Sequence, residues 1–129
     1  MAEAFATFAL VFAGCGAIVV NSERGGSLGE TGIAAAFGLA IMVMIYATGH
    51  LSGAHINPAV TVAFTSTRHF PVRDAVAYIP SQVAGAVAGA AVLRLAWEGT
   101  PANLGAKVST AATVRLGPSL SRTIRSTLR

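Results

Sequence analysis

Three long apolar stretches dominate the pattern of the chain. Each contains 19 consecutive residues without Asp, Glu, Lys, Arg or His. The stretches are residues 4–22, 31–49 and 75–93. A helix needs about 20 apolar residues to cross the hydrocarbon core of a bilayer. The pattern therefore predicts three transmembrane helices, at about residues 4–22, 32–51 and 72–97.

A fourth apolar stretch, residues 56–67, has only 12 uncharged residues and is too short to span. It opens on Asn57-Pro58, and Asn is a favoured N-cap while Pro is favoured at the first helical position. Because lipid satisfies no backbone groups, non-helical chain at membrane depth must be covered by protein or line a wet cavity. We therefore expect an extended loop before a re-entrant half-helix at about residues 58–67. The positive end of its dipole would face the cavity.

The composition agrees with a membrane setting. The hydrophobic fraction is 53% and the charged fraction 11%, against about 25% charged residues in soluble domains. A soluble all-α protein is the alternative, but a small soluble domain cannot bury three helices that are apolar all round. The first stretch also lacks the basic segment of a signal peptide. We therefore predict an all-α, multi-pass protein of the cell membrane.

Charge is distributed unevenly along the chain. Residues 1–98 carry a net charge of −1 and residues 99–129 a net charge of +5. The basic segment lacks interleaved aromatic residues, so nucleic-acid binding is not predicted. We expect residues 107–129 to be a disordered tail or to touch anionic headgroups. The positive-inside rule places Arg68 and Arg73 in the cytoplasm, and the tail then lies outside, against the rule.

Small residues are concentrated in the third long stretch. Gly85 and Gly89 lie four residues apart among several alanines. Small residues let membrane helices approach closely. Their spacing predicts a close contact with another helix on this face.

The run from Ser52 to Thr61, Ser-Gly-Ala-His-Ile-Asn-Pro-Ala-Val-Thr, closely resembles the first signature loop of the aquaporin, or major intrinsic protein, family. Weaker resemblances lie at residues 2–8, 36–40, 82–86 and 103–106. The likeness covers about residues 2–106. Family members have six spanning helices in two inverted halves, and their pore forms where two Asn-Pro-Ala half-helices meet. The resemblance implies that residues 1–106 are one inverted-repeat half of such a bundle.

The chain also departs from the family pattern. A second Asn-Pro-Ala is absent, and residues 107–129 contain no apolar run long enough to span. We therefore expect an incomplete half-channel for water or small neutral solutes, explained by truncation or a shifted reading frame. The alternative is a non-conducting truncated membrane fragment or packing subunit. The resemblance implies membrane lipid, the permeant solute, and either a homo-oligomer such as the family tetramer or a complementary half as partners.

The resemblance also implies roles for the residues of the loop. Asn57 would donate its amide to a permeant oxygen, Pro58 would start the half-helix, and Ala59 would allow the matching half-helix to approach. Backbone carbonyls would form a ladder of acceptors that replaces the hydrogen bonds of passing water. The ladder comprises Gly53, Ala54, His55 and Ile56.

Three further positions are assigned, and two of them, Phe37 and Glu3, have alternatives. Phe37 resembles the filter position of the second helix, or else packs against core or lipid. Ile41 lies four residues on, shares the face of Phe37, and could form an apolar pore wall. For Glu3, the resemblance implies that it accepts hydrogen bonds from the amides of the re-entrant loop, and the alternative is a solvated N-terminal acid.

No enzymatic or metal site is predicted. His50 and His55 lie five residues apart with no Cys or carboxylate nearby, and a zinc site needs three or four ligands. The single cysteine, Cys15, has no activating base predicted beside it. We therefore expect no metal, no cofactor and no catalytic residue.

Overall fold

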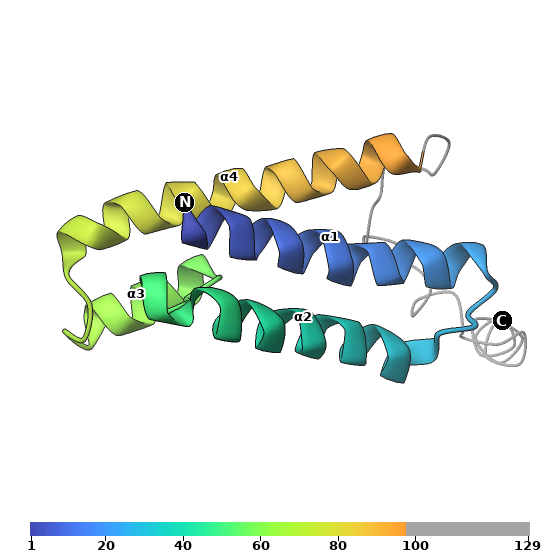
Figure 1. Cartoon of the computed structure of the whole chain (residues 1–129), viewed down its shortest axis with the longest axis horizontal. Coiled ribbons are helices and arrows are strands. Elements are labelled where there is room, and N and C mark those ends of the chain that lie inside the picture. The colour runs from blue at the N-terminus through green and yellow to red at the C-terminus, as the bar shows by residue number, and fades with distance from the viewer. Residues whose placement is uncertain (98–129) are drawn as a thin grey trace, which may run out of the picture.

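The computed structural model describes residues 1–97, which form four helices (Figure 1). The helices are α1 (Ala2–Glu23), α2 (Gly29–Ser52), α3 (Pro58–Ser66) and α4 (Val72–Ala96). Within this part of the chain there is no strand, and α1, α2 and α4 are each long and apolar enough to cross a membrane. These features confirm the predicted fold class of three spans and one short helix.

The helix ends differ from the predicted ones by only a few residues. α2 begins at Gly29, three residues earlier than expected, and α4 ends at Ala96. Asn21 contributes to the early start of α2, because its Oδ1 accepts hydrogen bonds from the N–H groups of Leu28 and Gly29, at 3.0 and 2.9 Å. The predicted tail at residues 107–129 and the resemblance at residues 103–106 lie outside the described residues.

α1 is the central helix of the described bundle. It packs against α2 on one side and α4 on the other, and α3 packs against α4 (Figure 1). The first turns of α1 lie beside the middle of α4, because Ala4 is the neighbour of Gly85. The N-terminal half of α4 therefore extends past α1 and reaches α3.

Two glycines of α4 make the closest helix contact. A Cβ atom on Gly85 would overlap the carbonyl group of Ala4, and one on Gly89 would lie 2.8 Å from the carbonyl oxygen of Phe8. Both glycines are buried. The predicted close contact at this face is therefore confirmed, with α1 as the partner helix.

Adding one methyl group at this contact is expected to separate the two helices. We expect Gly85→Ala to lower the free energy of unfolding by about 1–3 kcal/mol, because a backbone carbonyl occupies the site of the new Cβ. Gly38→Ala is the matched control, since Gly38 lies within α2 and has open space at its Cβ position. Unfolding in mixed micelles, followed by circular dichroism, measures both. Equal effects of the two substitutions would contradict the contact.

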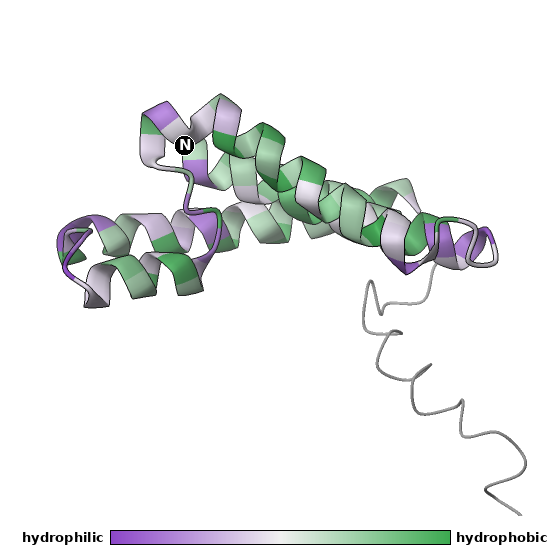
Figure 2. Cartoon of the chain, turned by 90° about the horizontal axis from the view of Figure 1, so that it is seen from below, coloured by the Kyte–Doolittle hydropathy of each residue, from purple (hydrophilic) through white to green (hydrophobic). Residues whose placement is uncertain are grey.

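The interior of the bundle is polar as well as apolar. Hydrophobic residues cover the long helices, while hydrophilic residues gather at the turns and near α3 (Figure 2). Five polar side chains are nevertheless buried. They are Glu3, Thr7, Thr48, Thr61 and Gln82. Buried polar groups need hydrogen-bond partners, and Glu3, Thr61 and Gln82 supply them to one another and to the loop before α3.

Candidate functional site

The loop between α2 and α3 has an unusual backbone. Gly53, Ala54 and Ile56 all have positive φ values, of 77°, 47° and 55°. Glycine adopts this conformation freely, but a β-branched residue such as Ile56 rarely does. Each such residue costs on the order of 1–3 kcal/mol and persists only where its surroundings fix it. The loop must therefore be held by contacts from outside it.

Glu3 supplies most of those contacts. Its side chain is only 3% exposed, and its carboxylate accepts four hydrogen bonds. Oε1 accepts from Ser52 Oγ at 2.7 Å and from the N–H of His55 at 3.0 Å. Oε2 accepts from the N–H of Ile56 at 2.8 Å and from Gln82 Nε2 at 2.7 Å. Hydrogen bonds to an ionised group are the strong ones, so α1 and α4 together fix the loop. Two alternatives were open for Glu3. The structure shows the one in which Glu3 accepts hydrogen bonds from the amides of the loop.

The network continues from Gln82 into α3. Gln82 Nε2 also donates to Thr61 Oγ1 at 3.0 Å, and Thr61 Oγ1 lies 3.0 Å from His55 Nδ1. Gln82 and Thr61 are both completely buried. Gln82 Oε1 has no hydrogen-bond partner among the described residues. One continuous chain of polar groups thus joins α1, the loop, α3 and α4.

Aromatic rings fix the side chain of His55. Its imidazole packs against Phe64, Phe70 and Tyr78, with ring centroids 5.1, 4.7 and 5.4 Å away. The hydroxyl of Tyr78 donates a hydrogen bond of 3.0 Å to the carbonyl oxygen of Ser52, in the last turn of α2. The side chain of His55 thus packs among these rings, while its backbone carbonyl stays in the loop.

Sequence reasoning missed several of these residues. Thr61 and Gln82 lie in segments that resemble the family but have no individual signal of their role, and Tyr78 lies outside those segments. The available signal was a polar side chain inside an apolar stretch, because such groups in a membrane helix are usually partnered. Nothing in the sequence names the partner.

Asn57 starts α3 as predicted from the Asn-Pro pair. It has an extended backbone, with φ −151° and ψ 128°, and its Oδ1 accepts a hydrogen bond of 2.8 Å from the N–H of Ala59. Pro58 is the first residue of the helix. The Asn57 side chain is exposed, and its amide nitrogen has no partner among residues 1–97. Since an amide donates two hydrogen bonds, both donors are available to a ligand.

The loop also presents free acceptors. Within the described part of the chain, no hydrogen bond ends on the carbonyl oxygens of Gly53, Ala54 or His55. The carbonyl of Ile56 accepts a long bond of 3.4 Å from Thr7 Oγ1. A carbonyl oxygen has two lone pairs, so Ile56 keeps one acceptor position.

Phe37 and Ile41 lie apart from this network. The ring of Phe37 packs directly over Gly14 of α1, leaving no room for a Cβ there. Ile41 is among the exposed hydrophobic residues of α2. In the structure Phe37 thus packs against α1. A filter role for Phe37 and a pore-wall role for Ile41 stay predictions.

The family model described as Major intrinsic protein matches residues 1–128. The chain belongs to the major intrinsic protein family. It is also similar to Aquaporin NIP1-1 of Oryza sativa subsp. japonica, with 50% identity over 99 residues that cover 77% of this chain and 35% of that protein. Aquaporin NIP1-1 of Zea mays is 48% identical over 99 residues, with the same coverage.

A third major intrinsic protein shows the same extent of likeness. Aquaporin NIP1-2 of Arabidopsis thaliana is 50% identical over 95 residues, which cover 74% of this chain and 32% of that protein. The chain thus spans about a third of the length of these relatives. The predicted resemblance is confirmed, and family membership with three apolar helices makes this a multi-pass membrane protein.

Proposed function

We propose that this chain provides one half of a membrane channel for passive transport of water or small neutral solutes. Asn57 carries the proposal, because its free amide adjoins a loop that is held beside the middle of α4. The adjoining loop is bonded through Glu3 to Gln82, and Gln82 is near the midpoint of α4. Asn57 caps the N-terminus of α3 and has an unpaired amide donor beside the middle of a candidate span. We infer that this donor binds an oxygen atom of the permeant molecule.

The loop adds acceptors to the donor of Asn57. The carbonyls of Gly53, Ala54 and His55 are free, while the N–H groups of His55 and Ile56 are occupied by Glu3. The path beside the loop therefore offers carbonyl oxygens followed by amide donors. Such a sequence can exchange hydrogen bonds with water or a hydroxyl-bearing solute. The single acid of the site has four donors around it, so it presents little charge to the path.

The exposed faces of the described residues are consistent with a half that needs a complement. Among the helices of residues 1–97, α2 packs along its length against α1 and meets α4 at the hydrogen bond from Tyr78 to Ser52. Its remaining surface carries exposed apolar side chains such as Leu39, Val43 and Tyr46. The proposal therefore includes a complementary half or a homo-oligomer as partner, in the cell membrane. Since the chain spans about a third of its relatives, a non-conducting membrane subunit is the second candidate.

A permeability measurement separates these functions. We expect the 129-residue polypeptide in proteoliposomes to give the water permeability of empty vesicles, because one half-helix leaves one side of the path uncovered. A chimera of Aquaporin NIP1-1 of Oryza sativa, in which residues 1–97 replace the matching segment, is expected to conduct water or glycerol. Stopped-flow light scattering after an osmotic step measures both.

Two results would count against the proposal. A chimera that folds, as judged by circular dichroism and a monodisperse size-exclusion profile, but stays at the permeability of empty vesicles favours the non-conducting subunit. Clear permeability of the 129-residue polypeptide alone, with low activation energy, would show that no complement is needed.

A further inference from the structure

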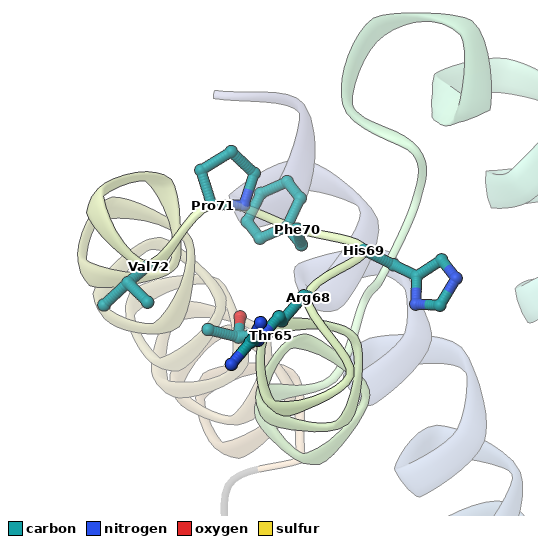
Figure 3. A pocket seen from close by; sticks show the side chains of 6 residues that line it. All are labelled: Thr65, Arg68, His69, Phe70, Pro71 and Val72. Atoms are coloured by element: carbon teal, nitrogen blue, oxygen red, sulfur yellow. The ribbon is translucent and has the colours of Figure 1, made fainter.

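An open cavity lies where the chain turns from α3 into α4. Its volume is about 390 Å³, and Figure 3 shows its lining side chains. The lining residues are Thr65, Arg68, His69, Phe70, Pro71 and Val72. This turn is outside the polar network of Glu3 and takes no part in the proposed path.

The length of α4 places the cavity at the membrane surface. Its 25 residues extend over about 37 Å at 1.5 Å per residue, whereas the hydrocarbon core is about 30 Å thick. As one end of this candidate span, the first turn of α4 reaches the headgroup layer. The cavity therefore opens at the level of lipid phosphates.

Arg68 gives the cavity its charge. Its side chain is exposed and makes no ion pair with any residue from 1 to 97, whereas His69 points away from it (Figure 3). The nearby Arg73 differs, since its Nε lies 3.4 Å from Asp74 Oδ1 and the two charges offset each other. Arg68 also has a positive φ of 61°. Its N–H donates a hydrogen bond to the carbonyl oxygen of Thr65. One uncompensated cation thus lines the cavity.

An apolar stripe on α4 begins at the same place. Val72 lines the cavity, and three further valines follow it on one face of the helix, because positions 4, 11 and 15 residues on fall within about 60° of it. The exposed fractions are 68% for Val72, 69% for Val76, 50% for Val83 and 63% for Val87. Arg68 at the headgroup level can face the phosphate of a phospholipid, and the apolar stripe of α4 can face its acyl chain.

We propose that the α3–α4 turn is a binding site for one anionic phospholipid, with its phosphate on Arg68 and an acyl chain along the valine stripe of α4. Basic residues beside an anionic leaflet attract its lipids, and a guanidinium recognises phosphate oxygens in pairs. The site does not depend on whether the chain conducts.

Competitive lipid binding tests the site directly. The 129-residue protein in uncharged detergent is mixed with equal amounts of phosphatidylglycerol and phosphatidylcholine of the same acyl chains, and bound lipids are counted by native mass spectrometry. We expect phosphatidylglycerol to be bound in excess. Arg68→Asn is expected to reduce that excess about fivefold, the effect of one basic residue near an anionic surface. Asn is chosen because it tolerates positive φ.

Matched variants test whether the preference for phosphatidylglycerol arises at the α3–α4 turn. Arg24→Asn removes the same charge at the end of α1, and it should leave the lipid ratio unchanged. Arg73→Asn should have a smaller effect than Arg68→Asn, because Asp74 already offsets Arg73. Val76→Ser should weaken retention of both lipids while keeping their ratio.

Several outcomes would overturn the proposal. They are no excess of phosphatidylglycerol in the unmodified protein, an excess that Arg68→Asn leaves intact, or equal loss in Arg24→Asn. If excess inorganic phosphate displaces the lipid completely, the site binds free anions instead. Should Arg68→Asn fail to fold, the unmodified protein still decides, since an excess that is insensitive to ionic strength would contradict binding through Arg68.

Discussion

Replacing Glu3 with alanine is expected to release the re-entrant loop and to lower the free energy of unfolding by several kcal/mol. Four donors lose their acceptor together, from Ser52, His55, Ile56 and Gln82. Each buried donor left without a partner costs about 1–3 kcal/mol. The positive φ of Ile56 also loses the contact that fixes it. Unfolding in mixed micelles, followed by circular dichroism, measures the loss.

Glu30→Ala is the matched control for this substitution. Glu30, like Glu3, is an acid in the first turn of a long apolar helix, but it is exposed. Its removal should cost only the interaction with the helix dipole, about 0.3–1 kcal/mol. Hydrogen exchange provides a second readout, since the amides of His55 and Ile56 should exchange faster in Glu3→Ala alone. Similar effects of the two variants on stability and exchange would show that Glu3 does not hold the loop.

Replacing Asn57 with aspartate is expected to abolish permeation through the chimera while preserving α3. Aspartate is as good an N-cap as asparagine, so the hydrogen bond from Ala59 can be kept. The two amide donors are lost, and a charge is added at membrane depth. Losing one hydrogen bond to the permeant and adding an unpaired charge should lower water permeability about tenfold or more.

Stopped-flow measurements on the chimera test this expectation, with circular dichroism to show that the helix content is unchanged. Asn57→Leu supplies the complementary case, because it removes both the cap and the donors. It should lower stability by about 1 kcal/mol in addition to blocking permeation. Unchanged permeability in Asn57→Asp, with the protein folded, would remove the amide from the path and leave Asn57 as a helix cap.

The fold could be predicted because charge is the dominant constraint in a membrane. Uncharged stretches gave the three spans, and the short stretch after Asn57-Pro58 gave α3 with its cap. The close contact at Gly85 followed from residue size alone. The start of α2 was harder to predict from the sequence, because Asn21 binds the N–H groups of Leu28 and Gly29 from across a loop of several residues.

The candidate site was only partly accessible from the sequence. The positive φ values of Ala54 and Ile56 have no signal in residue type, since neither is glycine and Ile disfavours that conformation. Ile56 donates its N–H to Glu3, 53 residues away, and Ala54 donates its N–H to Ser52 Oγ. The distant partner of Ile56 cannot be inferred from periodicity. The family resemblance includes Glu3, the loop and Thr61, whereas the role of Tyr78 follows only from its hydrogen bond to Ser52.

The sequence separations within the Glu3 network set an order of assembly. α1 and the loop precede α4 in the chain, and Gln82 follows Glu3 by 79 residues. The carboxylate therefore gains its last partner only when α4 has packed beside α1. Sliding α4 by one turn moves Gln82 by about 5.4 Å and breaks its bonds to both Glu3 and Thr61. Gln82 thus fixes the position of α4 along the helix axis relative to α1. Its two hydrogen bonds form only in this register, together with the full set of bonds that hold the loop.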